Sequence, residues 1–147
     1  MTEEVPGQPA REQRITRPTL LTVLCILTFT GSGLNIISGL AIGTFFNEFV
    51  RVAADLAETY KLPGMEMITE GSPGFFFISA LFYSGSVAGA VMMWRLRKTG
   101  FHVYAISQIL LLIAPMYFFK LPGPSVPDII FTGLFLILYS VNLRIMT

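Results

Sequence analysis

The sequence RPTLLTVLCILTFTGSGLNIISGLAIGTFF, residues 17–46, decides the fold. After Arg17 it contains no charged side chain as far as Phe46. An apolar run of about 18 or more residues is typical of a helix that crosses a membrane. The run is also too long for the apolar region of a signal peptide. We therefore expect the chain to keep these residues as a first membrane span.

Small residues interrupt this run at regular intervals. Gly31, Asn35, Gly39 and Gly43 lie four residues apart. On a helix this spacing predicts a narrow face, against which the backbone of a neighbouring helix can pack closely. We expect all four residues to contribute to helix packing, and Asn35 to donate or accept a hydrogen bond across the contact.

The composition extends the membrane assignment to most of the chain. Of the 147 residues, 53% are hydrophobic and only 13% are charged, against about 25% charged in soluble domains. Four apolar segments predict spans at about 18–46, 73–94, 101–118 and 128–145. We expect an all-α, polytopic four-helix bundle over residues 17–147, preceded by a disordered cytoplasmic tail over residues 1–16.

The basic residues beside the spans predict the orientation. With four spans, the segments before the first, between the second and third, and after the fourth lie on one side of the membrane. That side would hold seven basic residues and the other side three. The positive-inside rule then places both termini in the cytoplasm. The seven are Arg11, Arg14, Arg17, Arg95, Arg97, Lys98 and Arg144, and the three are Arg51, Lys61 and Lys120.

Residues 47–62 have a different pattern, with apolar and charged side chains on opposite helical faces. No proline or glycine separates them from the first span. We expect an amphipathic, extracytoplasmic extension of the first helix, which either stands off the membrane or bends onto its surface. Its acidic face could bind a partner protein, whereas its apolar face could simply lie on lipid.

The second span should pack closely on the first, because Gly85 and Gly89 give it a small-residue face of its own. Ser72 and Pro73 are a favourable helix start. Further along, Pro115 predicts a kink or an early end of the third span. Asp128 is expected to cap the fourth span after a stiff, proline-rich connection over residues 120–128.

Charged residues are missing from the middle of every predicted span. Proton relays, ion pathways and buried catalytic sites in membranes normally need such residues, so we expect neither an enzyme nor an ion pump. One histidine and one cysteine cannot build a tetrahedral metal site or a bis-histidine haem within one chain. We expect no cofactor. The dispersed basic residues also argue against nucleic-acid binding.

Two polar groups leave alternatives open. Arg95, Arg97, Lys98 and His102 could hold the phosphate of an anionic lipid, or the three cations could only set topology. Inside the spans, a second group could line a path for a small uncharged solute, or could form hydrogen bonds between helices. That group comprises Asn35, Ser84, Ser86, Ser107 and Gln108.

Two segments resemble a known group of proteins. Residues 17–29, RPTLLTVLCILTF, with Gly31-Ser32-Gly33, look like the opening of small uncharacterised four-span membrane proteins of Bacteroidota. Residues 93–101, MWRLRKTGF, with Tyr104 and Gln108, resemble the hairpin between their second and third spans. The resemblance implies a bacterial plasma (inner) membrane, and it brings no activity or catalytic residues with it.

The leading functional expectation is a non-enzymatic accessory or scaffold subunit, which contacts lipid and binds a membrane-protein partner or forms a homo-oligomer. The first alternative is an oligomeric transporter of a small solute or lipid. A lipid-modifying enzyme that depends on His102 is the third.

Overall fold

The computed structural model describes residues 18–61 and 71–146, and over these ranges the secondary structure is entirely helical. The α-helices are α1 (Thr19–Thr44), α2 (Phe46–Tyr60), α4 (Pro73–Trp94), α5 (Thr99–Phe119) and α6 (Val126–Val141), and α6 continues into a 3₁₀ turn, η1 (Asn142–Ile145). By length and composition, α1, α4, α5 and α6 with η1 could each cross a membrane. The expected all-helical architecture with four long apolar helices is confirmed.

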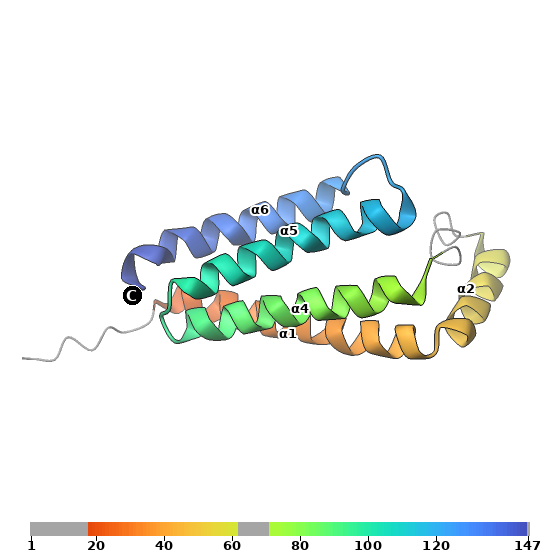
Figure 1. Cartoon of the computed structure of the whole chain (residues 1–147), viewed down its shortest axis with the longest axis horizontal. Helices are drawn as coiled ribbons and strands as arrows, with labels where there is room; N and C mark the ends of the chain where they lie inside the picture. Colours follow the sequence, from red (N-terminus) through yellow and green to blue (C-terminus); the bar gives the residue numbers. More distant parts are fainter. Residues whose placement is uncertain (1–17, 62–70, 147) are drawn as a thin grey trace, which may run out of the picture.

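The first predicted span ends earlier than residue 46. At Phe45 the backbone leaves helical geometry, with φ −105° and ψ 37°, and α2 begins at the next residue. Figure 1 shows α2 turning away from the axis of α1 across the end of the bundle. Aromatic contacts stabilise this bend between α1 and α2. The ring centroids of Phe46 and Phe49 lie 5.9 Å and 6.3 Å from the ring centroid of Phe76 on α4.

The helix starts follow local capping rules, with one correction. Ser72 caps α4 as expected, accepting a hydrogen bond from the Gly74 N–H at 3.3 Å, and Pro73 opens the helix. The start of α6 was predicted wrongly. Ser125 rather than Asp128 precedes its first residue, and Asp128 lies in the first turn, where its carboxylate accepts a hydrogen bond from Ser125.

Pro115 does not end the third span. It lies inside α5, which continues to Phe119. Proline removes one backbone hydrogen bond without preventing continuation, provided that the rest of the helix is well packed. The connection to α6 is therefore shorter than expected and runs only from Lys120 to Ser125.

In Figure 1, α4 lies beside α1 and α5 lies beside α6, and these four long helices form the bundle. Helix α4 is central, because it packs along both α1 and α5, whereas α6 makes few close contacts with either α5 or α1. The expected close pairing of the first two spans is confirmed. In Figure 1 the ribbons of α4 and α5 lie close together at the end that carries the α4–α5 turn and diverge toward the other end, where the ring of Phe75 still contacts the rings of Phe118 and Phe119.

A core of buried side chains closes the first of these ends. Its members come from the start of α1, the end of α4, the start of α5 and the last residues of the chain. They are Leu21, Leu24, Cys25, Met93, Tyr104, Tyr139 and Met146. The bundle is therefore well packed at one end, and α6 is joined to the other helices mainly there.

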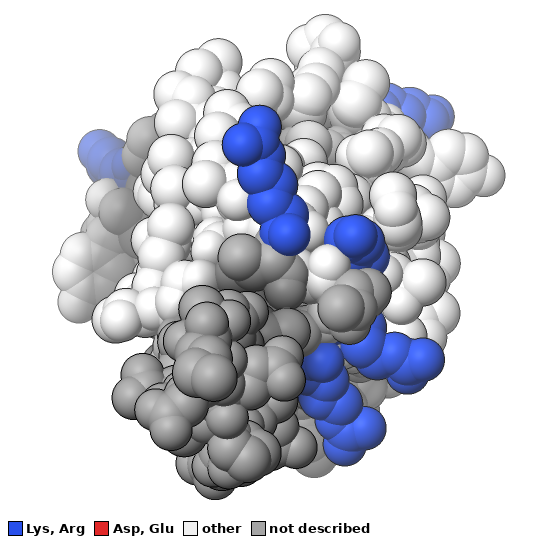
Figure 2. All heavy atoms as spheres, turned by 90° about the vertical axis from the view of Figure 1, so that its left-hand side faces the viewer, with Lys and Arg blue, Asp and Glu red and all other residues white. Residues whose placement is uncertain are grey.

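Charge is distributed unequally between the two ends. Figure 2 looks at the closed end and shows Lys and Arg side chains there, with no Asp or Glu among the described residues in view. Arg95, Arg97, Lys98 and Arg144 are all exposed. In the described residues, the acidic side chains belong to α2 and α6: Glu48, Asp55, Glu58 and Asp128.

Candidate functional site

The small-residue stripe of α1 divides between two environments. A Cβ atom added to Gly39 would lie 3.0 Å from the Phe76 carbonyl oxygen, and one added to Gly43 would lie 3.0 Å from the ring of Phe77. These two glycines therefore pack tightly against α4. A Cβ at Gly31 would meet nothing within 4 Å.

Asn35 also lies outside the α1–α4 contact, which corrects its predicted role. It is exposed, and its side-chain N–H₂ donates to the Gly31 carbonyl of its own helix at 2.8 Å. The reason is geometric. Each step of four residues rotates a helical position by about 40°, because one turn takes about 3.6 residues. Over three steps the stripe turns by about 120°, so Gly31 and Gly43 cannot face the same neighbour.

The glycines of α4 pack against α5 instead of α1. A Cβ at Gly89 would lie 2.6 Å from the Tyr104 nitrogen and 2.8 Å from the Gly100 oxygen, and one at Gly85 would overlap the Ser107 side chain. Gly100 completes this contact, since its own Cβ would lie 2.6 Å from the Gly89 oxygen. Here α4 and α5 are in backbone contact.

Three polar side chains meet where α1, α4 and α5 come together. Ser86 is fully buried, and its Oγ accepts hydrogen bonds from Ser32 Oγ at 3.3 Å and from Gln108 Nε2 at 3.1 Å. Of the polar side chains singled out in the sequence, Ser86 and Gln108 are thus brought together. Ser84 and Ser107 instead donate to the carbonyls of Ala80 and Val103, each within its own helix.

A second polar contact joins α1 to α6 nearer the closed end. The Thr28 and Tyr139 hydroxyls are 2.8 Å apart, and both residues are buried. The Tyr139 ring also packs edge-on against Tyr104 of α5, with 4.9 Å between ring centroids. Thr28, Tyr104 and Tyr139 therefore seal the interior toward the basic end of the molecule.

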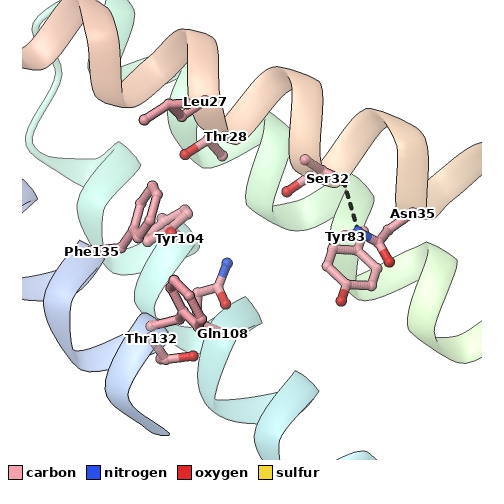
Figure 3. A pocket seen from close by; sticks show the side chains of 11 residues that line it. Leu27, Thr28, Ser32, Asn35, Tyr83, Tyr104, Gln108, Thr132 and Phe135 are labelled. Carbon is pink, nitrogen blue, oxygen red and sulfur yellow. Dashed lines mark hydrogen bonds between the residues drawn. The ribbon is translucent and has the colours of Figure 1, made fainter. Parts of the chain in front are cut away.

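Between this seal and the diverging end lies a cavity of about 380 Å³. All four long helices line it, and none of its eleven lining residues is charged. Figure 3 shows the side chains of Ser32, Tyr83, Gln108 and Thr132 around a common space. Within residues 18–61 and 71–146, the hydroxyls of Tyr83 and Thr132 have no hydrogen-bond partner. The cavity thus offers uncommitted neutral hydrogen-bonding groups in an apolar bundle.

A smaller hollow of about 250 Å³ adjoins this cavity and shares Tyr83, Gln108, Phe131 and Thr132 with it. It extends between α4, α5 and α6 toward the diverging end, where Pro115 and Asp128 line it. Asp128 is the one charged residue in its lining. The two hollows give the bundle a polar interior that reaches toward the end where α2 lies.

The predicted anionic-lipid group is placed at the basic end. Arg95, Arg97, Lys98 and His102 are all exposed in or beside the turn between α4 and α5. Leu96 makes this turn tight by adopting a left-handed conformation, with φ 60°. The exposed cations suit a membrane surface, and anionic-lipid binding at this group stays a prediction.

Sequence reasoning missed most residues of the cavity, although a signal was present. Thr28, Ser32 and Asn35 follow each other at spacings of four and three, the pattern of one helical face. Tyr104 and Gln108 repeat this spacing on α5, as do Tyr83 and Ser86 on α4. Polar faces at helical spacing on three apolar helices would have predicted a shared polar interior.

The described residues contain no cluster of three or more His, Cys, Asp or Glu side chains that could hold a metal ion. Since none of its lining residues is charged, the cavity can act through neutral hydrogen bonds and apolar contact. Comparisons of the chain with protein-family models, with curated proteins and with solved structures find no match.

Proposed function

We propose that this chain is a non-enzymatic, multi-pass protein of a bacterial plasma membrane that binds a small uncharged molecule inside its four-helix bundle, as a carrier or transporter does. The observation that carries the proposal is the uncharged cavity lined by all four long helices. Ligand sites commonly combine an apolar wall with a few polar groups that fix orientation. Tyr83, Gln108 and Thr132 would be those groups here.

The proposal keeps both termini in the cytoplasm. The four exposed cations at the closed end support this orientation, because basic residues favour the cytoplasmic side of a membrane. The cavity would then be sealed toward the cytoplasm by Thr28, Tyr104 and Tyr139, and the smaller hollow would extend toward the outer face.

The test removes two hydroxyl groups from the cavity without changing its shape. Tyr83→Phe with Thr132→Val deletes the two hydroxyls that lack partners, and a matched control, Tyr117→Phe with Thr30→Val, deletes the same groups from exposed positions outside the cavity lining. Native mass spectrometry of protein extracted with its surrounding lipid should detect a stoichiometric small molecule on the wild type and on the control. Its occupancy should fall about tenfold in the cavity variant, as expected when roughly 1.4 kcal/mol of binding free energy is lost.

An accessory subunit remains a second candidate because of the surface of α2. Val52, Leu56 and Tyr60 are exposed on this helix, beside the acidic side chains Glu48 and Asp55. The small-residue faces give this candidate less support, because Gly39, Gly43, Gly85 and Gly89 are already used inside the bundle. The same mass spectra distinguish the two functions. A stoichiometric second protein, with no small molecule on any variant, would favour the accessory subunit.

A further inference from the structure

Two residues that line the cavity, one on α1 and one on α6, are exposed, which places its opening between these helices. These helices make few close contacts beyond the Thr28–Tyr139 hydrogen bond. The side chains at the opening are exposed: Leu27 to 53% on α1 and Phe131 to 63% on α6, with Gly31 and Asn35 beside them. In a bundle that spans a bilayer, exposed Leu and Phe side chains within a span contact hydrocarbon. The cavity therefore opens sideways into lipid.

The interior of the cavity suits an uncharged polar group. Transfer of an ion out of water without a counterion costs several kcal/mol or more, and none of the residues lining the larger cavity could neutralise one. A hydroxyl or amide group can instead pair with the Tyr83 and Thr132 hydroxyls and donate to the side-chain oxygen of Asn35, whereas a carbonyl group can accept from the two hydroxyls. The Asn35 N–H₂ group is already committed to Gly31.

The size of the cavity limits what can enter completely. A volume of about 380 Å³ has room for on the order of ten non-hydrogen atoms, since a water molecule occupies about 30 Å³ of liquid. A polar head with a short part of its chain fits inside. A longer chain must leave through the opening, past Leu27 and Phe131.

From these three observations we infer that the ligand is an uncharged single-chain amphiphile that enters from the bilayer between α1 and α6. Its polar head lies beside Tyr83, Asn35 and Thr132, and its chain passes between Leu27 and Phe131 into lipid. This inference rests on the proposed function of the cavity as a binding site, and it adds the ligand class and the route of access.

Gly31 and Gly33 provide a matched pair for the test. A Cβ at either position would meet nothing within 4 Å, so a side chain can start from each backbone position without a clash at its first atom. Gly31 lines the cavity and Gly33 does not. Gly31→Phe should therefore block the opening, whereas Gly33→Phe should only add a side chain to the surface of α1.

The protein would be reconstituted in phosphatidylcholine vesicles with hexadecanol that carries a diazirine beside its hydroxyl. After illumination, labelled peptides would be mapped by mass spectrometry. We expect labels on cavity residues of α1 and α6 in the wild type and in Gly33→Phe, and about tenfold less labelling in Gly31→Phe, which corresponds to about 1.4 kcal/mol. Excess unlabelled hexadecanol should suppress this labelling in the wild type, whereas hexadecyl sulfonate should not.

Equal labelling of the two glycine variants, or equal suppression by the sulfonate, would overturn the inference. A third probe, butanol with the same diazirine, separates this inference from the proposed function. If butanol labels the cavity residues and hexadecanol does not, the binding site stands and lateral access by an amphiphile is refuted. If neither probe labels them, the proposed function is refuted as well.

Discussion

Gly89 and Gly100 determine how closely α4 and α5 approach. Each position leaves no room for a Cβ atom, because the nearest obstacles are backbone atoms of the other helix at 2.6 Å. Backbone cannot rotate aside as the end of a flexible side chain can. Small residues at such contacts let membrane helices gain van der Waals contact that larger residues prevent.

Gly100→Ala should therefore destabilise the protein by about 1–3 kcal/mol, the usual cost of overpacking. The free energy of unfolding would be measured by titrating the protein with sodium dodecyl sulfate in mixed micelles. Gly33→Ala is the control. Its added methyl group meets open space, and the higher helix propensity of alanine should leave the stability unchanged or raise it by up to about 1 kcal/mol. Equal stabilities of the two variants would contradict the assigned contact.

At the residue scale, the sequence indicated which glycines lie in helix contacts. It did not indicate which helix each of them contacts. The spacing of four correctly marked Gly39, Gly43, Gly85 and Gly89 as small positions on helices. It could not show that those of α4 face α5, because helix rotation depends on the packing of the whole bundle. Gly100 was missed because a lone glycine after a turn has no periodic pattern.

Helix α6 is the least firmly held of the long helices. Its exposed side chains include Ile130, Phe131 and Ile137, each more than 60% exposed. The hydrogen bond between Thr28 and Tyr139 connects it to α1, 2.8 Å from oxygen to oxygen. In a membrane such a bond has no water to compete with it, although measured values remain modest, near 0.6 kcal/mol on average.

A double-mutant cycle isolates this connection. Thr28→Val and Tyr139→Phe each remove one hydroxyl and keep the volume of the side chain. We expect the two changes to be non-additive by about 0.6–1.7 kcal/mol in the free energy of unfolding. The control cycle pairs Thr30→Val with Tyr117→Phe, two exposed residues, and should be additive. Additivity in both cycles would mean that the Thr28–Tyr139 bond does not hold α6.

At the scale of elements, the length and composition of the apolar segments were sufficient to predict the four long helices. They were not sufficient to predict where each helix begins and ends. The second span, α4, was placed correctly because Ser72 and Pro73 give an unambiguous helix start. A bend after the first span was one of two expectations, but its position at Phe45 was not predicted, since neither proline nor glycine marks it. Its physical cause is tertiary, because Phe46 and Phe49 gain ring contacts with Phe76 when α2 bends. At α6 the sequence analysis expected Asp128 to be the cap, whereas the helix begins at Val126, directly after Ser125.

The described part of the molecule is closed at its basic end, and its two hollows lie toward the other end. Close glycine contacts join α4 to α5, and the Tyr104–Tyr139 core fills the space beside them. Beyond this core the ribbons of α4 and α5 diverge (Figure 1), and all four long helices line the cavity. This divergence depends on the angle at which the packed helices cross, and no local pattern in the chain encodes that angle. The sequence therefore predicted a bundle with small-residue packing, and left the role of its polar residues open.

The central claim is that the middle of this bundle is polar and open, and thiol reactivity tests it most directly. Thr132→Cys places a thiol in the cavity, whereas Ile137→Cys places one on the lipid-facing side of the same helix, at a position that is 63% exposed. The native Cys25 is fully buried and should remain unreactive. Only a thiolate reacts with N-ethylmaleimide, and it forms where water or polar groups reach the sulfur. In lipid nanodiscs we expect Thr132→Cys to react at least about tenfold faster than Ile137→Cys. Equally slow reaction at both positions would show that the interior is as apolar as the lipid face, and would contradict the proposed binding site.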